Sequence, residues 1–449
     1  MTQSLNQKLI PWMLTFYLGI APIYWLPAVP MQALFVLKLG LVALSVVLVF
    51  MQSLVIRGNI MFPKGLAGPM GWILLVVTAA PGFFQATPAA GFTRFYDSIL
   101  IFVFSWTFYN LTHNGVNVLK IFWHAGLMIT GFASLTLLHA LTGLPSWQAP
   151  VPSLEPLTLS RVGFHMLSSG WACGIVLFLP LLLAILYAYH AHRFIRSSTT
   201  TAAAGVGLFF ILFASMFVVS GRTGLLAATV VAMFIALKMV SRTVGLMLSG
   251  GIGLAAYQSW ERYFNHLRFD RLRSSEMDDI SRFSSGRVDG YLEGVRLIME
   301  RPFTGHGFDT LDMREYGIIA KDIHNLWLKM AGDAGIFYPI AFSCILATYA
   351  LKFKRILDLT PEPNARRFYT TFGLIIPCGL IVASLSPTGI FGSFQNNAVF
   401  WAAIGYLLAK VDIKEAEAAT RRTQTETSTT PEAEKTPNAP QTPITRSPA

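Results

Sequence analysis

Charged residues are scarce in this 449-residue chain. They make up 13% of it, about half the share found in typical soluble domains, whereas hydrophobic residues make up 53%. The apolar excess lies in windows of about 20 residues with almost no charge, long enough to cross ~30 Å of hydrocarbon. One larger soluble core would not need such windows. The sequence therefore predicts an all-α polytopic membrane protein.

Metal-binding and nucleotide-binding motifs are also missing. The three cysteines lie inside apolar runs without the spacing of a metal site, and we expect them to be small buried residues without a disulfide. There is no GxSxG, P-loop or HExxH sequence. Asp278 and Asp279 are adjacent, so their side chains point in different directions and favour solvation over shared ligation. We predict no metal and no cofactor.

Positive charge is plentiful, with a net charge of +11, but it is not gathered in a basic domain with interleaved aromatic residues. This argues against nucleic acid as a partner. Most Lys and Arg residues lie in short loops between apolar runs, which is typical of cytoplasmic loops. With the N-terminus and Lys8 inside, this bias predicts that both termini are cytoplasmic.

We expect about 12 transmembrane helices, each about 17–27 residues long. The predicted spans are 9–28, 31–56, 66–85, 95–111, 117–142, 165–191, 202–219, 223–240, 243–258, 325–351, 368–386 and 392–410. The predicted domains are an N-terminal transmembrane bundle (1–258), a long periplasmic segment (259–323), C-terminal transmembrane helices (324–411) and a disordered cytoplasmic tail rich in Thr, Pro, Ala and Glu (412–449). The span at 243–258 contains a Gly pair that would loosen its helix.

The long periplasmic segment contains one amphipathic pattern. Residues 286–301 place apolar side chains at helical spacing, with Ser284 and Ser285 as candidate N-caps and Pro302 after the end. This predicts a helix. It could lie on the membrane surface, or it could cover a small core of the periplasmic segment itself.

Four residues at the predicted outer membrane edge are candidates for chemistry: Arg161, Arg222, Arg287 and His324. Arg222 interrupts two apolar runs, where a charge costs about 2.5–3.5 kcal/mol at worst depth, so we expect it to have a partner. One interpretation is contact with lipid headgroups. The other is an anion site, because the guanidinium fork matches phosphate oxygens.

His324 stands where the long outer segment re-enters the membrane. A lone histidine in such a place is commonly structural. However, a neutral imidazole can also take a proton from a hydroxyl near pH 7, and the arginines nearby favour this second interpretation.

The residues around His324 resemble a known family. His324-Asn325, nine residues, and then Gly335-Ile-Phe-Tyr338 are similar to the H-[NSQ]-x9-G-x-x-[GTY] motif of bacterial O-antigen ligases. Arg287 and, further along the chain, the PFTGHGF sequence that begins at Pro302 resemble the segment before this histidine in ligases and in related polysaccharide polymerases. The long late outer segment and the many spans extend the resemblance over nearly the whole chain.

The resemblance implies a GT-C-like glycosyltransferase of the bacterial inner membrane with a periplasmic active site. The implied donor is an undecaprenyl-diphosphate-linked glycan, the implied acceptor is a sugar hydroxyl of lipid A–core, and neither metal nor ATP is implied. His324 matches the family histidine and Arg287 the arginine before it, while Arg161 and Arg222 match earlier outer-face arginines through shorter motifs. Asn325, Gly335 and Tyr338 are supporting motif positions.

Three alternatives remain. An O-antigen polymerase would use the same donor with a second lipid-linked glycan as acceptor, and a protein O-oligosaccharyl ligase would use a protein. A transporter of lipid-linked glycans would be expected to show internal repeats and charges near the midplane of the membrane. The sequence contains no such repeat, and its charges gather at one face.

Overall fold

The computed structural model describes residues 2–22, 31–142, 168–191, 207–216, 222–239, 287–317, 322–385 and 394–429. Within these residues the regular secondary structure is helical and no strand occurs, which confirms the predicted all-α class. The predicted span at 243–258 lies outside the described residues.

Most of the described helices are long enough to contribute to a bundle. The helices are α1 (Thr2–Ile20), α2 (Met31–Arg57), α3 (Pro69–Gln85), α4 (Pro88–His113), α5 (Val118–Thr142), α6 (Ser168–Ala191), α8 (Arg222–Met239), α11 (Arg287–Glu300), α12 (Leu326–Ala334), α13 (Phe337–Asp358), α14 (Pro363–Phe372), α15 (Ile375–Leu385) and α16 (Phe394–Thr429). A further helix covers Gly207–Met216, and short 3-10 turns cover Gly65–Ala67 and Met313–Tyr316.

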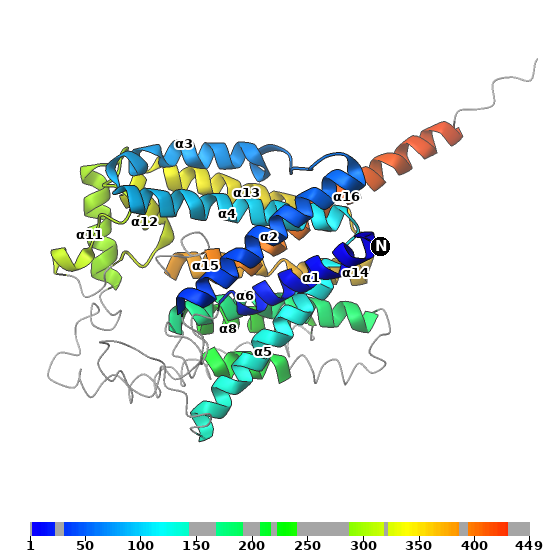
Figure 1. Ribbon diagram of the computed structural model, residues 1–449, viewed down its shortest axis with the longest axis horizontal. Helices are drawn as coiled ribbons and strands as arrows, with labels where there is room; N and C mark the ends of the chain where they lie inside the picture. Colours follow the sequence, from blue (N-terminus) through cyan, green and yellow to red (C-terminus); the bar gives the residue numbers. More distant parts are fainter. Residues whose placement is uncertain are drawn as a thin grey trace, which may run out of the picture.

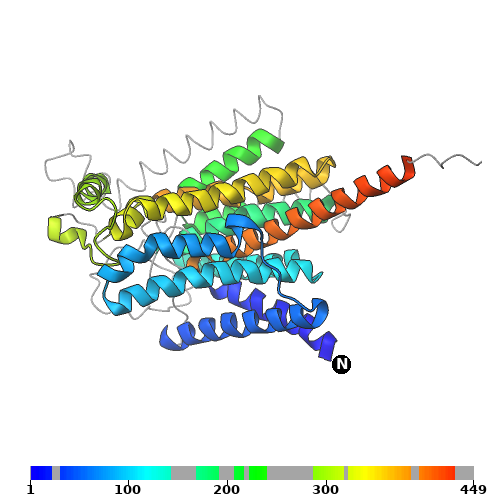
Figure 2. The same ribbon diagram turned by 90° about the horizontal axis from the view of Figure 1, so that it is seen from above.

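The bundle has two distinct ends. Helices α2, α3, α4, α13 and α16 run roughly along its length (Figure 1). Helix α11 instead crosses one end and is seen nearly along its axis in the view from above (Figure 2). The N-terminus and the projecting C-terminal part of α16 lie at the opposite end (Figure 1).

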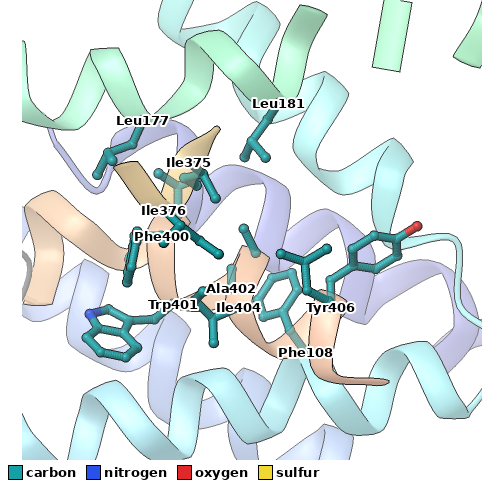
Figure 3. Close-up of a cluster of buried hydrophobic side chains, with 14 of the residues drawn as sticks. Phe108, Leu177, Leu181, Ile375, Ile376, Phe400, Trp401, Ala402, Ile404 and Tyr406 are labelled. Carbon is teal, nitrogen blue, oxygen red and sulfur yellow. The ribbon is translucent and has the colours of Figure 1, made fainter. Parts of the chain in front are cut away.

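The core of the bundle is aromatic and aliphatic. Trp401 and Phe400 of α16 lie near Ile375 and Ile376 of α15, and Phe108 of α4 approaches from the other side (Figure 3). All five side chains are buried. Helices α4 and α16, far apart in the sequence, pack against each other through this core.

The outer surface of the bundle is also apolar. On α2, Val36, Val47 and Val55 are each more than half exposed, and on α3 so is Val77. Three described helical segments are long and apolar enough to cross a membrane, namely Gln32–Arg57, Val118–Leu138 and Pro363–Leu385, and shorter apolar helices accompany them. Such a surface is unfavourable in water and favourable in lipid. These features indicate a membrane protein, while the number of about 12 spans stays a prediction.

Two predicted spans are broken in the structure. The span at 325–351 divides into α12 and α13 at Gly335, whose φ of 90° does not continue a helix. The span at 368–386 divides into α14 and α15. Pro377 has no N–H to donate to the carbonyl of Gly373, four residues earlier, which favours a break at that place.

The tail differs from the expectation of disorder from residue 412. Helix α16 continues without a break to Thr429. Its extension, KEAEAATRRTQTETST, contains many Ala, Glu, Lys and Arg residues, which have high helix propensity. Low hydrophobicity alone therefore does not predict disorder here. A polar helix that extends an already formed helix does not need its own nucleation step.

Candidate active site

Helix α11 confirms the amphipathic helix predicted for residues 286–301, since it covers Arg287–Glu300. The buried face of α11 is narrow. Gly290, Gly294, Leu297 and Ile298 are buried, and α11 packs against α12. Close packing between the two helices brings the start of α11 near the loop that carries His324.

The PFTGHGF segment after α11 is bonded to the end of α12. The backbone N–H of His306 donates to the carbonyl of Gly332 (2.8 Å), and that of Gly307 donates to the carbonyl of Asp333 (2.9 Å). Gly305 has φ 63°, and a Cβ there would lie 2.5 Å from the backbone N of Ala334. The glycines of this segment therefore allow the loop to lie directly on the C-terminal end of α12.

His324 has a defined tautomer. Its Nδ1 lies 2.9 Å from the backbone carbonyl of Asp322. A carbonyl oxygen can only accept, so Nδ1 carries the proton and the neutral ring keeps its lone pair on Nε2. The Tyr291 hydroxyl of α11 donates to the backbone carbonyl of His324 at 2.8 Å, which holds the same loop from the other side.

The electrostatic surroundings keep His324 neutral. Burial lowers the pKa of His324 below its usual 6.5, and the positive charge of Arg287 lowers it further. The hydrogen bond to Asp322 and the charge of that residue act in the opposite direction but are outweighed. An imidazole with a lowered pKa is deprotonated near pH 7, which a general base requires.

The supporting motif residues have structural roles around His324. The Asn325 side chain caps α12 by accepting from the N–H of Leu328 (3.1 Å), and its amide donates to the carbonyl of Ser384 at the end of α15 (3.2 Å). Gly335 ends α12. Tyr338 is buried in the first turn of α13, with its ring edge-on to Phe308.

The arginines are described to different extents. Arg287 opens α11, and its charge acts on His324, so the structure brings these two predicted residues together. Arg222 is the first residue of α8, and only its backbone is described. Arg161 lies outside the described residues.

A network of charged side chains is connected to His324 through Asp322. Lys329 of α12 is 7% exposed, and its ammonium is 3.1 Å from Asp322, 3.5 Å from Asp309 and 3.9 Å from Asp333. Asp309 also pairs with Arg94 of α4 at 2.8 Å. Burial raises the pKa of Asp309, but Arg94 and Lys329 outweigh this effect and bring it below its usual value.

Comparison with protein families gives a match in the part of the chain that contains His324. Residues 206–343 match the family model Wzy_C, described as O-antigen ligase. The match covers about a third of the chain, and over these residues the chain is similar to the O-antigen ligase family. Among curated proteins, the comparison found no match.

The segment that matches Wzy_C contains Arg222, Arg287, His324 and the motif residues around them. It also contains Asp309 and Lys329, which are not among the site residues predicted from the sequence, whereas Arg94 lies before it. A signal for Lys329 was present, because it forms an i,i+4 pair with Asp333 inside an apolar run, and ionisable residues in such runs are commonly functional. For Asp309 the sequence offers no comparable signal, since its partner Arg94 is 215 positions away.

No group of three or more His, Cys, Asp or Glu side chains is arranged to hold a metal ion in the part of the chain that the structure describes. The carboxylates near Lys329 are arranged around its ammonium instead. A metal-independent reaction stays a prediction, which a chelator can test.

Proposed function

We propose that the protein is an O-antigen ligase of the bacterial inner membrane. It would transfer a glycan from undecaprenyl diphosphate to a sugar hydroxyl of lipid A–core at the periplasmic face, in a GT-C-like fold. The observation that supports this most is the position of His324 inside the segment that matches the O-antigen ligase model, with Nδ1 bonded to a carbonyl and the pKa of the ring lowered by burial and by Arg287. Its Nε2 is therefore the basic atom of the ring.

The proposed reaction is a single displacement. Nε2 of His324 takes the proton of the acceptor hydroxyl as that oxygen attacks the anomeric carbon of the first donor sugar. The bond between this carbon and the diphosphate oxygen breaks, and undecaprenyl diphosphate leaves with its electron pair. The anomeric centre is inverted, and His324 becomes an imidazolium that later releases its proton to water.

The arginines would bind the diphosphate. Arg161, Arg222 and Arg287 would stabilise the negative charge that develops on the leaving group, as fixed cations do in a site that excludes water. The bidentate guanidinium fork suits this task better than an ammonium. Within the described residues, Arg287 is the one whose charge acts on His324, which supports a donor position next to this histidine.

The arrangement of the bundle is compatible with chemistry at one membrane face. Helix α11 and the adjoining α12 lie at the end opposite the N-terminus and the projecting part of α16 (Figure 1). If the termini are cytoplasmic, as the distribution of Lys and Arg predicts, then His324 faces the periplasm.

A reconstituted transfer assay tests the proposal. The purified protein in lipid vesicles is given a labelled undecaprenyl-diphosphate-linked glycan together with lipid A–core, a second lipid-linked glycan or a pilin-type protein. Label on lipid A–core supports a ligase. Label on the second glycan identifies a polymerase, and label on the protein identifies a protein O-oligosaccharyl ligase.

The same assay tests metal independence and transport. Transfer should continue in excess EDTA, and loss of transfer that Mg²⁺ restores would contradict a metal-free reaction. Movement of the lipid-linked glycan between leaflets without any transfer would instead support a transporter.

A further inference from the structure

Asp322 contacts His324 and Lys329 through different atoms. Its backbone carbonyl accepts from Nδ1 of His324 (2.9 Å), and its carboxylate accepts from the ammonium of Lys329 (3.1 Å). Because both contacts belong to one residue, the position of the Lys329 ammonium constrains the peptide that orients the histidine ring.

Lys329 is itself held firmly. It lies in the first turn of α12, where its backbone N–H donates to the carbonyl of Asn325 at 2.9 Å. Its side chain is almost fully buried and is within 4.0 Å of three carboxylates, from Asp322, Asp309 and Asp333. A buried ammonium with several carboxylate partners has few other positions available to it.

The network also reaches the transmembrane bundle. Asp309, in the loop after α11, pairs with Lys329 and with Arg94 of α4, whose side chain is 12% exposed. The N–H of Phe308, next to Asp309, donates to the carbonyl of Gly82 in α3. These contacts connect the loop that carries Asp322, by way of Lys329 and Asp309, to helices α3 and α4 of the bundle.

Stability alone does not explain this arrangement. Taking charges out of water is costly, and well-packed apolar residues of similar volume are often equally stable or more stable than a buried ion network. Such a network instead fixes relative positions, because the buried Lys329 ammonium keeps its charge compensated only while its carboxylate partners stay close to it. Because this network is joined to His324 through Asp322, such rigidity is useful for chemistry that depends on the direction of one nitrogen.

We propose that Lys329 is a positioning residue that acts through Asp322 to orient His324. This inference rests on the proposed function, in which Nε2 of His324 takes the proton of the acceptor. The Asp322 carboxylate has a second effect, since its negative charge favours the imidazolium that forms during the reaction, and Lys329 limits this effect by neutralising it.

Three substitutions separate these contributions. Asp322→Asn keeps the backbone carbonyl and the side-chain shape but removes the charge. Lys329→Met removes the ammonium and keeps a similar length. Lys329→Arg keeps the charge. We expect Asp322→Asn and Lys329→Met to lower kcat for glycan transfer about tenfold or more with little change in the KM for the donor, and Lys329→Arg to recover part of that loss.

The pH profile distinguishes positioning from a purely structural role. In the described part of the chain, the charged or titratable groups facing His324 are Arg287 and Tyr291 from α11 and Asp322 from its own loop, with Lys329 of α12 behind Asp322. Asp322→Asn removes a negative charge, so the rising limb of the profile should move to lower pH. Lys329→Met exposes that charge, so the limb should move to higher pH. A general loss of folded protein would move neither.

The double variant adds a second criterion. If Lys329 acts through Asp322, then Lys329→Met should reduce kcat much less in the Asp322→Asn background than in the wild-type protein. Equal fold losses in the two backgrounds would overturn the inference. If Lys329→Met accumulates poorly, the shift of the pH profile for Asp322→Asn alone remains decisive.

A matched control is available at the other end of the bundle. Lys352 pairs with Asp412 at 3.5 Å, and Lys352→Met should leave kcat and the pH profile unchanged. Normal kcat and pH profiles in Asp322→Asn and Lys329→Met, together with an inactive His324→Ala, would overturn the positioning role and leave the proposed function intact. Full transfer by His324→Ala would overturn both.

Discussion

The two ends of the bundle use charged residues differently. At the end crossed by α11, the side chains of Lys329 and Asp333 are 7% and 5% exposed, whereas their partners Asp322 and Asp309 are 34% and 45% exposed. This network is joined to His324 through the backbone carbonyl of Asp322. At the end near the N-terminus, Lys352 and Arg355 of α13 pair with Asp412 and Glu415 of α16, and these side chains are 21–52% exposed.

Exposed ion pairs contribute little to stability, because water screens them and two long side chains must be immobilised. Buried ones are costly to form and costly to break. The contrast teaches that charge at the second end is compatible with ordinary solvation, whereas the buried charges of Lys329 and Asp333 at the α11 end need a specific reason. The proposed active site supplies that reason.

The largest expected effect is from His324→Ala. General-base catalysis typically contributes about 10²–10⁴-fold, so transfer in reconstituted vesicles should fall by about 100-fold or more. Insertion and folding should be retained, since the backbone carbonyl that accepts from Tyr291 is still present. As a control, His124→Ala removes an exposed histidine that stacks on Trp12, and transfer should stay at the wild-type rate. Equal activities of the two variants would remove the functional distinction between these histidines.

Arg287→Lys should have the next largest effect. Lysine keeps the charge but cannot form two parallel hydrogen bonds to a phosphate, and we expect transfer to fall roughly tenfold, or about 1.4 kcal/mol. The matched variant is Arg296→Lys on the same helix, where the arginine is exposed and pairs with Glu293 and Glu300. If both variants lose the same activity, α11 is sensitive to any substitution and the diphosphate role of Arg287 is wrong.

Gly335→Ala tests the break between α12 and α13. At φ 90° a side chain is strained by about 1–3 kcal/mol, and a Cβ there would also meet the carbonyl of Phe303. The thermal unfolding midpoint in detergent should fall measurably. Gly317→Ala has a similar φ of 78° but nothing within 4 Å of its Cβ, so a smaller decrease is expected. Equal decreases would show that the close approach contributes nothing.

Arg355→Ala should have the smallest effect. Its guanidinium pairs with Glu415 at 3.1 Å, but the two side chains are 52% and 38% exposed. The loss should stay within about 1 kcal/mol, with unchanged transfer. A large loss of transfer would break the contrast between the two ends, because an exposed pair far from His324 would then matter to the reaction.

Several of the helices could be predicted from the sequence, and so could the candidate histidine. The predicted span at 31–56 and α2 nearly coincide, as do the span at 117–142 and α5. His324 was selected from a local motif, and its neighbour Arg287 from its place before an amphipathic helix. In contrast, Lys329 lies inside a predicted apolar span, because hydropathy averages over a window of residues and a single paired charge changes that average little.

Long apolar runs determine helices by themselves, since backbone groups in lipid must find their hydrogen bonds within the same segment. The sequence alone thus determined the helical class, and its motif selected His324. Only the tertiary structure decided that Arg94, Asp309 and Lys329 form one network, and that Asp322 holds the Nδ1 of His324. These contacts depend on how α4, α11 and α12 pack, and no local pattern specifies the partner of a charge 215 positions away.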